Sequence, residues 1–332
     1  MIFDDFPLGA ADGVILAHSL PLPDGTLKKG RRLGAADLAR LRAAGRSHVT
    51  GIRLEPDDLT EDQAADEIAG AIMGDGLNRG LAVTGRCNLL ASVRGVVEID
   101  RGRVDALNCV HEAVTLATVA PWELVEPGQM VASVKIIPFA VPQQIVRNCL
   151  QMADPGGGKL IAVRPLLPQK VAIIVTTLAG KENSGDAFFA VSRTRIEELG
   201  GEWLSEQRCP HEQEPLAAAI LEALARECTL LLIAGAAACV DRRDVVPAAI
   251  VACGGEIEHF GMPVYPGNLM LLARARGVPV IGLPGCARSA KLNGVDLVLR
   301  RLAAGLPVTS ADIRTMGTGG LLQGVPKRFH TL

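Results

Sequence analysis

Residues 229–247, TLLLIAGAAACVDRRDVVP, constrain the fold more than any other stretch of the chain. The apolar run 230–233 predicts a short buried strand, and the small residues 235–238 predict a tight loop after it. Asp244 then precedes an apolar-periodic segment that stops at Gly254. An aspartate at the N-cap, a proline in the first turn and a glycine past the end are the usual signals of a helix. The stretch is therefore predicted to be a strand, a loop and a helix start, which is where open α/β sheets bind ligands.

Two arginines stand beside the start of this predicted helix, where positive charge is unfavourable. Arg242 and Arg243 lie next to the positive end of the helix dipole, which disfavours cations by about a few tenths of a kcal/mol. An anion bound at the helix end, such as a phosphate or a pterin phosphate, would reverse the sign of this effect. The alternative is that both arginines point to solvent and bind nothing.

The segment 236–247 resembles the signature GGTGxxxRDVTP of the molybdopterin-binding domain family, whose adenylyltransferases and molybdotransferases act in molybdenum-cofactor biosynthesis. The resemblance implies a phosphate-binding loop that holds molybdopterin, and it implies that Asp244 supports adenylyl or metal transfer. In this loop the cofactor-binding residues would be Gly235, Ala236, Ala237, Ala238, Arg242 and Arg243. Three alanines and Cys239 replace Gly, Gly, Thr and Gly of the signature. Because added Cβ atoms narrow a loop and restrict positive φ, this departure bears on catalysis more than on fold.

Two other predicted turns of the same region carry cations near a helix start. The loop LAGKENSG contains Lys181, and the loop GLPGCARSAK contains Arg288 and Lys291. If the preceding strands are parallel, these turns and the 235–244 loop open on one edge of the sheet. Helix starts surrounded by cations would then form an anion pocket.

Two further loops match the family. GLPGCARS resembles the LPGNPxS segment of the molybdotransferases, which implies that Gly285 and Ser289 help to hold the cofactor, although Gly285 could instead only allow a tight turn. Cys286, Ala287 and Arg288 depart from the Asn-Pro pattern, so Arg288 is a candidate cofactor-binding residue through its charge near a helix start. PVYPGN resembles a loop between the late strands, which implies that Gly267 and Asn268 line the pocket or make a turn. In the first of these loops, Cys286 is either a helix-start thiol with a lowered pKa or a small residue of the turn.

Asp186 is the second candidate acidic residue. It resembles the aspartate that follows an SGxYxD-like loop in the adenylyltransferases, and its alternative role is a plain helix N-cap. On the resemblance, Asp186 and Asp244 would be catalytic and would hold Mg²⁺ against the phosphates of the ligand and of ATP, since Mg²⁺ is bound by one or two carboxylates and phosphate oxygens. We expect no histidine to take part.

The domain organisation follows from composition and pattern. The predicted order is an N-terminal α+β region over 1–150, a linker over 151–170 that is rich in glycine and proline, and a C-terminal tail over 306–332. Between them, alternating strands and helices over 171–305 predict an α/β domain with a mostly parallel sheet, and the resemblance implies the three-layer molybdopterin-binding type. The opening ADGVILAHSL also resembles the start of the molybdotransferases, or it belongs to any small α+β unit.

Composition limits the partners. The net charge is −2 and no Lys/Arg-rich run occurs, so we expect no nucleic-acid binding. No apolar stretch is long enough to span a membrane without interruption, the N-terminus lacks the basic region of a signal peptide, and the eight cysteines form no CxxC pair. We therefore expect a cytoplasmic protein with reduced thiols. The resemblance further implies a homo-oligomer.

Three functions are consistent with these features. The first is a transferase of molybdenum-cofactor biosynthesis that moves an adenylyl group or molybdate with Mg²⁺. The second is a module that binds the cofactor without catalysis and delivers it to a partner, such as a nucleotidyltransferase or a molybdoenzyme. The alanines of the 235–238 loop favour this second function, as does the absence of the acids of a TGDEL-like motif after the first strand. The third is a nucleotide-processing relative of the competence/damage-inducible proteins.

Overall fold

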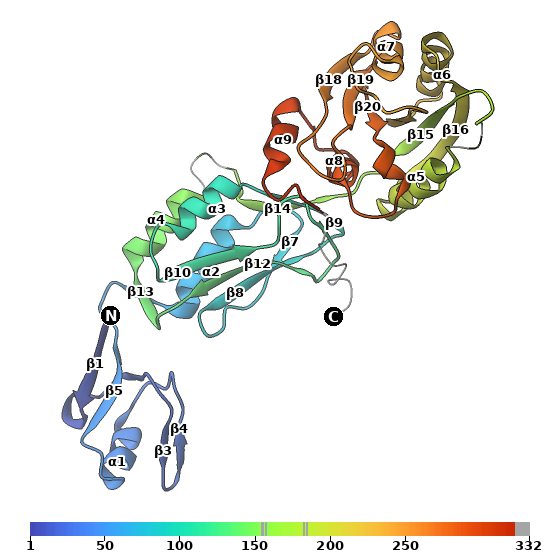
Figure 1. The fold of residues 1–332 in the computed structure, drawn as a ribbon. Coiled ribbons are helices and arrows are strands. Elements are labelled where there is room, and N and C mark those ends of the chain that lie inside the picture. The colour runs from blue at the N-terminus through green and yellow to red at the C-terminus, as the bar shows by residue number, and fades with distance from the viewer. Residues whose placement is uncertain (154–155, 157, 182, 184, 323–332) are drawn as a thin grey trace. The chain divides into compact units, whose positions relative to one another are not determined.

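The computed structural model describes residues 1–153, 156, 158–181, 183 and 185–322. The chain divides into two compact units, Met1–Arg164 and Pro165–Leu332 (Figure 1). It mixes helices with strands, as predicted for an α/β protein, and most of its strand pairs are antiparallel. Within the described residues, no helix combines the length and the apolar character needed to cross a membrane.

The N-terminal part of the first unit is a small antiparallel structure with its own hydrophobic cluster. Its sheet has the order β1-β5-β2, and a separate hairpin pairs β3 with β4. The cluster contains Leu16, Leu38 and Leu41, which are all buried. The elements are β1 (Ile2–Pro7), β2 (Ile15–Leu16), β3 (Leu20–Leu22), β4 (Gly25–Leu27), α1 (Ala35–Ala43) and β5 (His48–Arg53).

The rest of the first unit packs helices against antiparallel sheets. Its larger sheet has the order β10-β12-β8-β7, and two smaller ones have the orders β11-β9-β14 and β13-β6. The helix α2 begins with a capping box between Thr60 and Gln63 and buries Ile68 and Ile72 in the core. The elements are β6 (Asp58–Thr60), α2 (Glu61–Ile72), β7 (Leu77–Arg79), β8 (Arg86–Ala91), β9 (Gly95–Ile99), α3 (Arg101–Asn108), β10 (Val114–Thr118), β11 (Leu124–Val125), β12 (Met130–Ile136), β13 (Ala140–Pro142), α4 (Gln143–Ala153) and β14 (Ile161–Pro165).

The second unit is built on one six-stranded sheet with the order β16-β15-β17-β20-β19-β18. The pairings β15–β16, β15–β17 and β17–β20 are parallel, whereas β19 is antiparallel to both β20 and β18. The strands are β15 (Lys170–Thr177), β16 (Glu202–Pro210), β17 (Leu230–Ala234), β18 (Glu256–Phe260), β19 (Leu271–Ala275) and β20 (Val278–Leu283). Only β19 therefore runs against the other five strands.

Helices cover both faces of this sheet. Successive residues of its central strands point to opposite faces, and both sets are buried. On one face, Ile174 and Ile233 pack with residues of α6 (Gln213–Ala225) and α7 (Val245–Ala252). On the other, Leu230 lies beside residues of α5 (Asp186–Glu198) and α8 (Gly294–Ala303). The assignment of this unit to the molybdopterin-binding type remains a prediction.

The structure differs from the sequence-based boundaries in three places. Within the predicted linker 151–170, β14 is a buried strand of the first unit, and the boundary between the units falls at Arg164 and Pro165. The apolar periodicity of residues 289–304 predicts a helix that starts near Ser289, but α8 begins at Gly294, because Asn293 is its N-cap. The predicted C-terminal tail 306–332 contains the short helix α9 (Ser310–Arg314), and its residues 323–332 lie outside the described part.

Candidate functional site

The topology of the second unit brings the sequence-predicted loops to one edge of the sheet. Parallel strands β15, β16, β17 and β20 end at the same edge, and β18 also ends there because two antiparallel steps separate it from β20. We call the loops at this edge the carboxyl rim; they comprise residues 178–181, 211–212, 235–244, 261–270 and 284–293. The rim contains the predicted residues except Asp186, which begins the helix that follows the first loop.

A buried hydroxyl at the end of β15 ties three parts of the rim together. Thr176 is 1% exposed, and its Oγ1 accepts the N–H of Ala236 over 2.8 Å. The same oxygen lies 2.8 Å from Nδ1 of His211, which directly follows β16. The 235–244 loop is therefore fixed to the neighbouring strand ends through its main chain.

The alanines of the 235–238 loop fit its backbone. None of the three alanines has a positive φ, so the loop does not require glycine at these positions. Gly235 does require it, because a Cβ there would lie 2.9 Å from the carbonyl oxygen of Ala237. The replacement of signature glycines by alanines thus causes no backbone strain in this loop.

Asp244 is the N-cap of α7, as predicted. Its Oδ1 accepts the N–H of Val245 over 2.8 Å, and its Oδ2 accepts the N–H of Val240 over 3.2 Å. Both carboxylate oxygens therefore bind backbone amides, which stabilise the negative charge and hold the loop against the helix start.

The two arginines of this loop lie at the surface. The side chain of Arg243 is 91% exposed and pairs through Nε with Oδ1 of Asp241 over 2.9 Å. The hydrogen bond from Arg243 holds the pKa of Asp241 below its ordinary value. Arg242 donates to the carbonyl of Ile257 over 3.4 Å. Because an exposed ion pair contributes little to stability, Arg243 can exchange Asp241 for an anionic ligand at small cost.

Asp186 occupies a different environment from Asp244. Its carboxylate accepts a hydrogen bond from Arg208 of β16, and the guanidinium of Arg208 lies 4.6 Å from the ring centre of Phe189. The two aspartates predicted to bind magnesium therefore have separate partners, a guanidinium for one and backbone amides for the other. Among the described residues, no group of three or more His, Cys, Asp or Glu residues is arranged to hold a metal ion. The magnesium site at Asp186 and Asp244 stays a prediction.

The loop after β20 is shaped by a buried arginine. Arg195 of α5 donates to the carbonyl oxygens of Ala287 and Ser289, each over 2.7 Å. Arg288 lies 5.0 Å from the ring centre of Phe188, and Gly285 has open space where a Cβ would stand. Ser289 Oγ accepts the N–H of Lys291 over 3.3 Å.

The thiol of Cys286 belongs to the same loop. Burial raises the pKa of this thiol, so the hypothesis of a lowered pKa at this helix start was wrong. The sequence suggested a reactive thiolate because a helix was expected to start close to Cys286, but α8 begins only at Gly294, and burial disfavours the charged thiolate.

The remaining predicted residues lie in the loops after β18 and β15. Gly267 has a φ of +140°, and a Cβ there would lie 2.8 Å from the backbone nitrogen of Gly294. Asn268 is exposed, and its Nδ2 donates to the carbonyl of Met262 over 3.1 Å, which makes it a turn residue as well as a rim residue. Lys181 is exposed in the first loop, where its N–H donates to the carbonyl of Leu178.

The sequence did not identify the rim residue His211, nor Arg195, which contacts the rim from α5. We expected no histidine to take part, but a Cβ added to Gly235 would lie 3.8 Å from Cε1 of His211. The imidazole therefore lies beside the predicted phosphate-binding loop. A signal was present in the sequence, because residues 203–207 predict a short strand, His211 comes four residues after it, and strand ends are where ligand-binding residues gather in this fold class.

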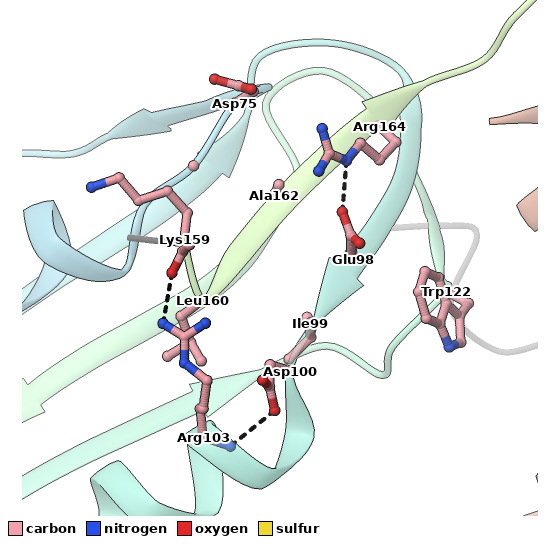
Figure 2. Close-up of a pocket in the computed structure, with 12 residues that line it drawn as sticks. Asp75, Glu98, Ile99, Asp100, Arg103, Trp122, Lys159, Leu160, Ala162 and Arg164 are labelled. Atoms are coloured by element: carbon pink, nitrogen blue, oxygen red, sulfur yellow. Dashed lines mark hydrogen bonds and ion pairs between the residues drawn. The ribbon is translucent and has the colours of Figure 1, made fainter. Parts of the chain in front are cut away.

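A separate pocket of about 430 Å³ lies in the first unit, over the neighbouring strands β9 and β14 (Figure 2). Its wall includes an ion pair of 2.6 Å between Glu98 Oε2 and Arg164 Nε. Nearby, Asp100 accepts the N–H of Arg103, and the guanidinium of Arg103 donates to the carbonyl of Gly158 over 2.7 Å. Three acidic and three basic residues line the pocket, and four of these six make the contacts just described. The equal numbers of acidic and basic side chains favour neither an anionic nor a cationic ligand.

Residues 5–53 match a family described as a domain of unknown function (DUF8806). A comparison with curated proteins gives no match. Two solved structures of a molybdopterin biosynthesis MoeA protein from Pyrococcus horikoshii each cover 92% of this chain and 76% of their own. Their sequence identities are 18% and 11%, with TM-scores of 0.31 and 0.27, so these likenesses carry no functional inference.

Proposed function

We propose that the second unit binds molybdopterin, or the molybdenum cofactor, along the carboxyl rim and acts in molybdenum-cofactor biosynthesis. The observation that supports this most is the topology of β15, β17 and β20. These parallel strands end side by side, so the loops that carry the family resemblance leave the sheet at one edge. Ligands of open α/β sheets bind at this edge.

The side chains of the rim suit a ligand with a phosphate and a flat ring. Lys181, Arg242, Arg243 and Arg288 supply positive charge for the phosphate. The same rim loops also carry exposed apolar side chains, of which Val240 is 73% exposed and Tyr265 is 48% exposed. A rim that combines cations with accessible apolar surface supports recognition of a phosphorylated pterin better than recognition of free phosphate.

The contacts of the two aspartates favour cofactor binding or delivery over group transfer. Asp244 already accepts two backbone N–H groups, and Asp186 is paired with Arg208. These contacts already stabilise the negative charge of both carboxylates, which lowers the gain from binding Mg²⁺. We therefore place binding first; transfer of an adenylyl group or molybdate with Mg²⁺ and ATP is the finer prediction. A partner nucleotidyltransferase or molybdoenzyme and a homo-oligomeric state also remain predictions.

The test is a titration of the protein with molybdopterin, in which the fluorescence of the pterin reports binding. Arg243→Ala removes an exposed cation of the rim and should weaken binding roughly tenfold, the effect of losing one charge-assisted contact. The matched control is Arg226→Ala. Arg226 is an exposed arginine paired with Glu222 at the opposite end of α6, outside the rim loops, and its removal should leave affinity unchanged.

Incubation with molybdopterin, ATP and Mg²⁺ then separates binding from transfer. Adenylylated pterin formed by the wild type and not by Asp244→Ala would support the transferase. Binding without turnover in either protein would support the delivery module. Absence of molybdopterin binding by the wild type would refute both.

A further inference from the structure

Arg195 is a buried charged side chain in the middle of α5 for which the sequence offers no role. It is 8% exposed, and fully buried arginines are rare unless they are paired. Its Nε pairs with Oδ1 of Asp296 over 2.6 Å. The guanidinium also donates to the carbonyl oxygens of Ala287 and Ser289 over 2.7 Å and of Lys291 over 3.2 Å. One side chain thus holds three carbonyls of a single rim loop.

The partner of Arg195 is itself fixed in place. Oδ2 of Asp296 accepts the N–H of Asn293 over 2.8 Å, and Asn293 is the buried N-cap of α8. The network therefore joins α5, the 284–293 loop and the start of α8. Because the planar guanidinium presents its N–H donors as a rigid fork, a lysine at this position could keep the charge but not the set of contacts.

A second contact between α5 and the same loop lies nearer the start of the helix. The guanidinium of Arg288 lies 5.0 Å from the ring centre of Phe188, which is 2% exposed. A cation over an aromatic face is attracted by the partial negative charge of that face, which comes from the quadrupole of the neutral ring. This contact orients the guanidinium of Arg288, which is one of the cations of the rim.

We propose that Arg195 is a positioning residue of the carboxyl rim. The guanidinium of Arg195 binds carbonyl oxygens of the 284–293 loop, so that these partially negative oxygens do not face a bound anion. Phe188 orients the guanidinium of Arg288 in the same loop. This role rests on the proposed function, because it concerns the affinity of the rim for a phosphorylated ligand. The effect on the loop can be measured without any ligand.

The test compares Arg195→Lys with Arg301→Lys. Arg301 is also a buried arginine, ion-paired with Asp312 over 3.0 Å and bound to the carbonyl of Pro307, but these partners lie outside the rim loops. Amide hydrogen exchange in the free proteins should be faster over 285–292 in Arg195→Lys and unchanged there in Arg301→Lys. The dissociation constant for molybdopterin should rise roughly tenfold in Arg195→Lys only.

Phe188→Leu provides a second variant if Arg195→Lys does not fold. It leaves the fork of Arg195 intact and removes the ring under Arg288, so the dissociation constant should rise by roughly two- to fivefold. Wild-type exchange over 285–292 together with wild-type affinity in Arg195→Lys would overturn the role of Arg195. Wild-type affinity in Phe188→Leu would overturn the part of the proposal in which Phe188 orients Arg288 for the ligand. If the wild type does not bind molybdopterin, the proposed function fails. The exchange measurement still decides whether Arg195 fixes the loop.

Discussion

The hydroxyl of Thr176 provides the most direct test of how the rim is held together. Thr176→Val keeps the shape of the buried side chain but removes the acceptor for the N–H of Ala236 and the partner of His211, each at 2.8 Å. A part-buried amide that loses its acceptor costs about 1–3 kcal/mol, and the similar shape of valine leaves no cavity. For a unit of this size, each kcal/mol lowers Tm by about 2–4 °C, so the expected loss is about 2–12 °C.

Two measurements check this prediction on Thr176→Val and its control. Thr176→Ser keeps the hydroxyl and should retain most of the stability lost in the valine variant. Thermal unfolding followed by circular dichroism gives Tm, and hydrogen exchange reports the protection of the Ala236 amide. Protection should disappear in Thr176→Val and persist in Thr176→Ser. A valine variant with the Tm and the amide protection of the wild type would show that the contact does not hold the loop.

Further predictions concern backbone strain and pH. Gly267→Ala should lower Tm, at a cost of about 1–3 kcal/mol, because φ is +140° and the new Cβ would lie 2.8 Å from the nitrogen of Gly294. Gly285→Ala should change stability by less than about 0.5 kcal/mol, because open space surrounds the new Cβ; equal losses would contradict this reasoning. Separately, the hydrogen bond from Arg31 holds the pKa of Asp37 below 3.8. Its carboxylate therefore stabilises the fold above pH 3.8, and this contribution disappears as the pH falls through the lowered pKa. Chemical unfolding at several pH values should show wild type and Asp37→Asn converging in acid; a constant difference would refute the assignment.

The central strand, loop and helix of the second unit could be predicted from the sequence because local signals agree there. The apolar run of β17, the small residues after it and the N-cap Asp244 all point to the same structure, and the observed bounds follow them. Local propensity and tertiary packing are consistent in this stretch, so the pattern alone was sufficient.

Long-range contacts were not predictable in the same way. Arg195 sits in a helix whose sequence pattern gives no reason to bury a charge, and its partners lie about a hundred residues further along the chain. The same holds for β14, which follows a glycine-rich segment typical of a linker but is buried as the edge of the sheet β11-β9-β14. In both cases the deciding interaction is tertiary, and a single sequence without its contacts cannot show it.

The attachment of the 235–244 loop has a consequence for how the rim can vary. Thr176 binds this loop through the backbone N–H of Ala236, a group that every residue except proline possesses. The side chain at position 236 is therefore uncoupled from the anchoring of the loop, and its chemistry can change while the scaffold stays the same. Substitutions there should alter which molecules the edge accepts without loosening the architecture beneath it.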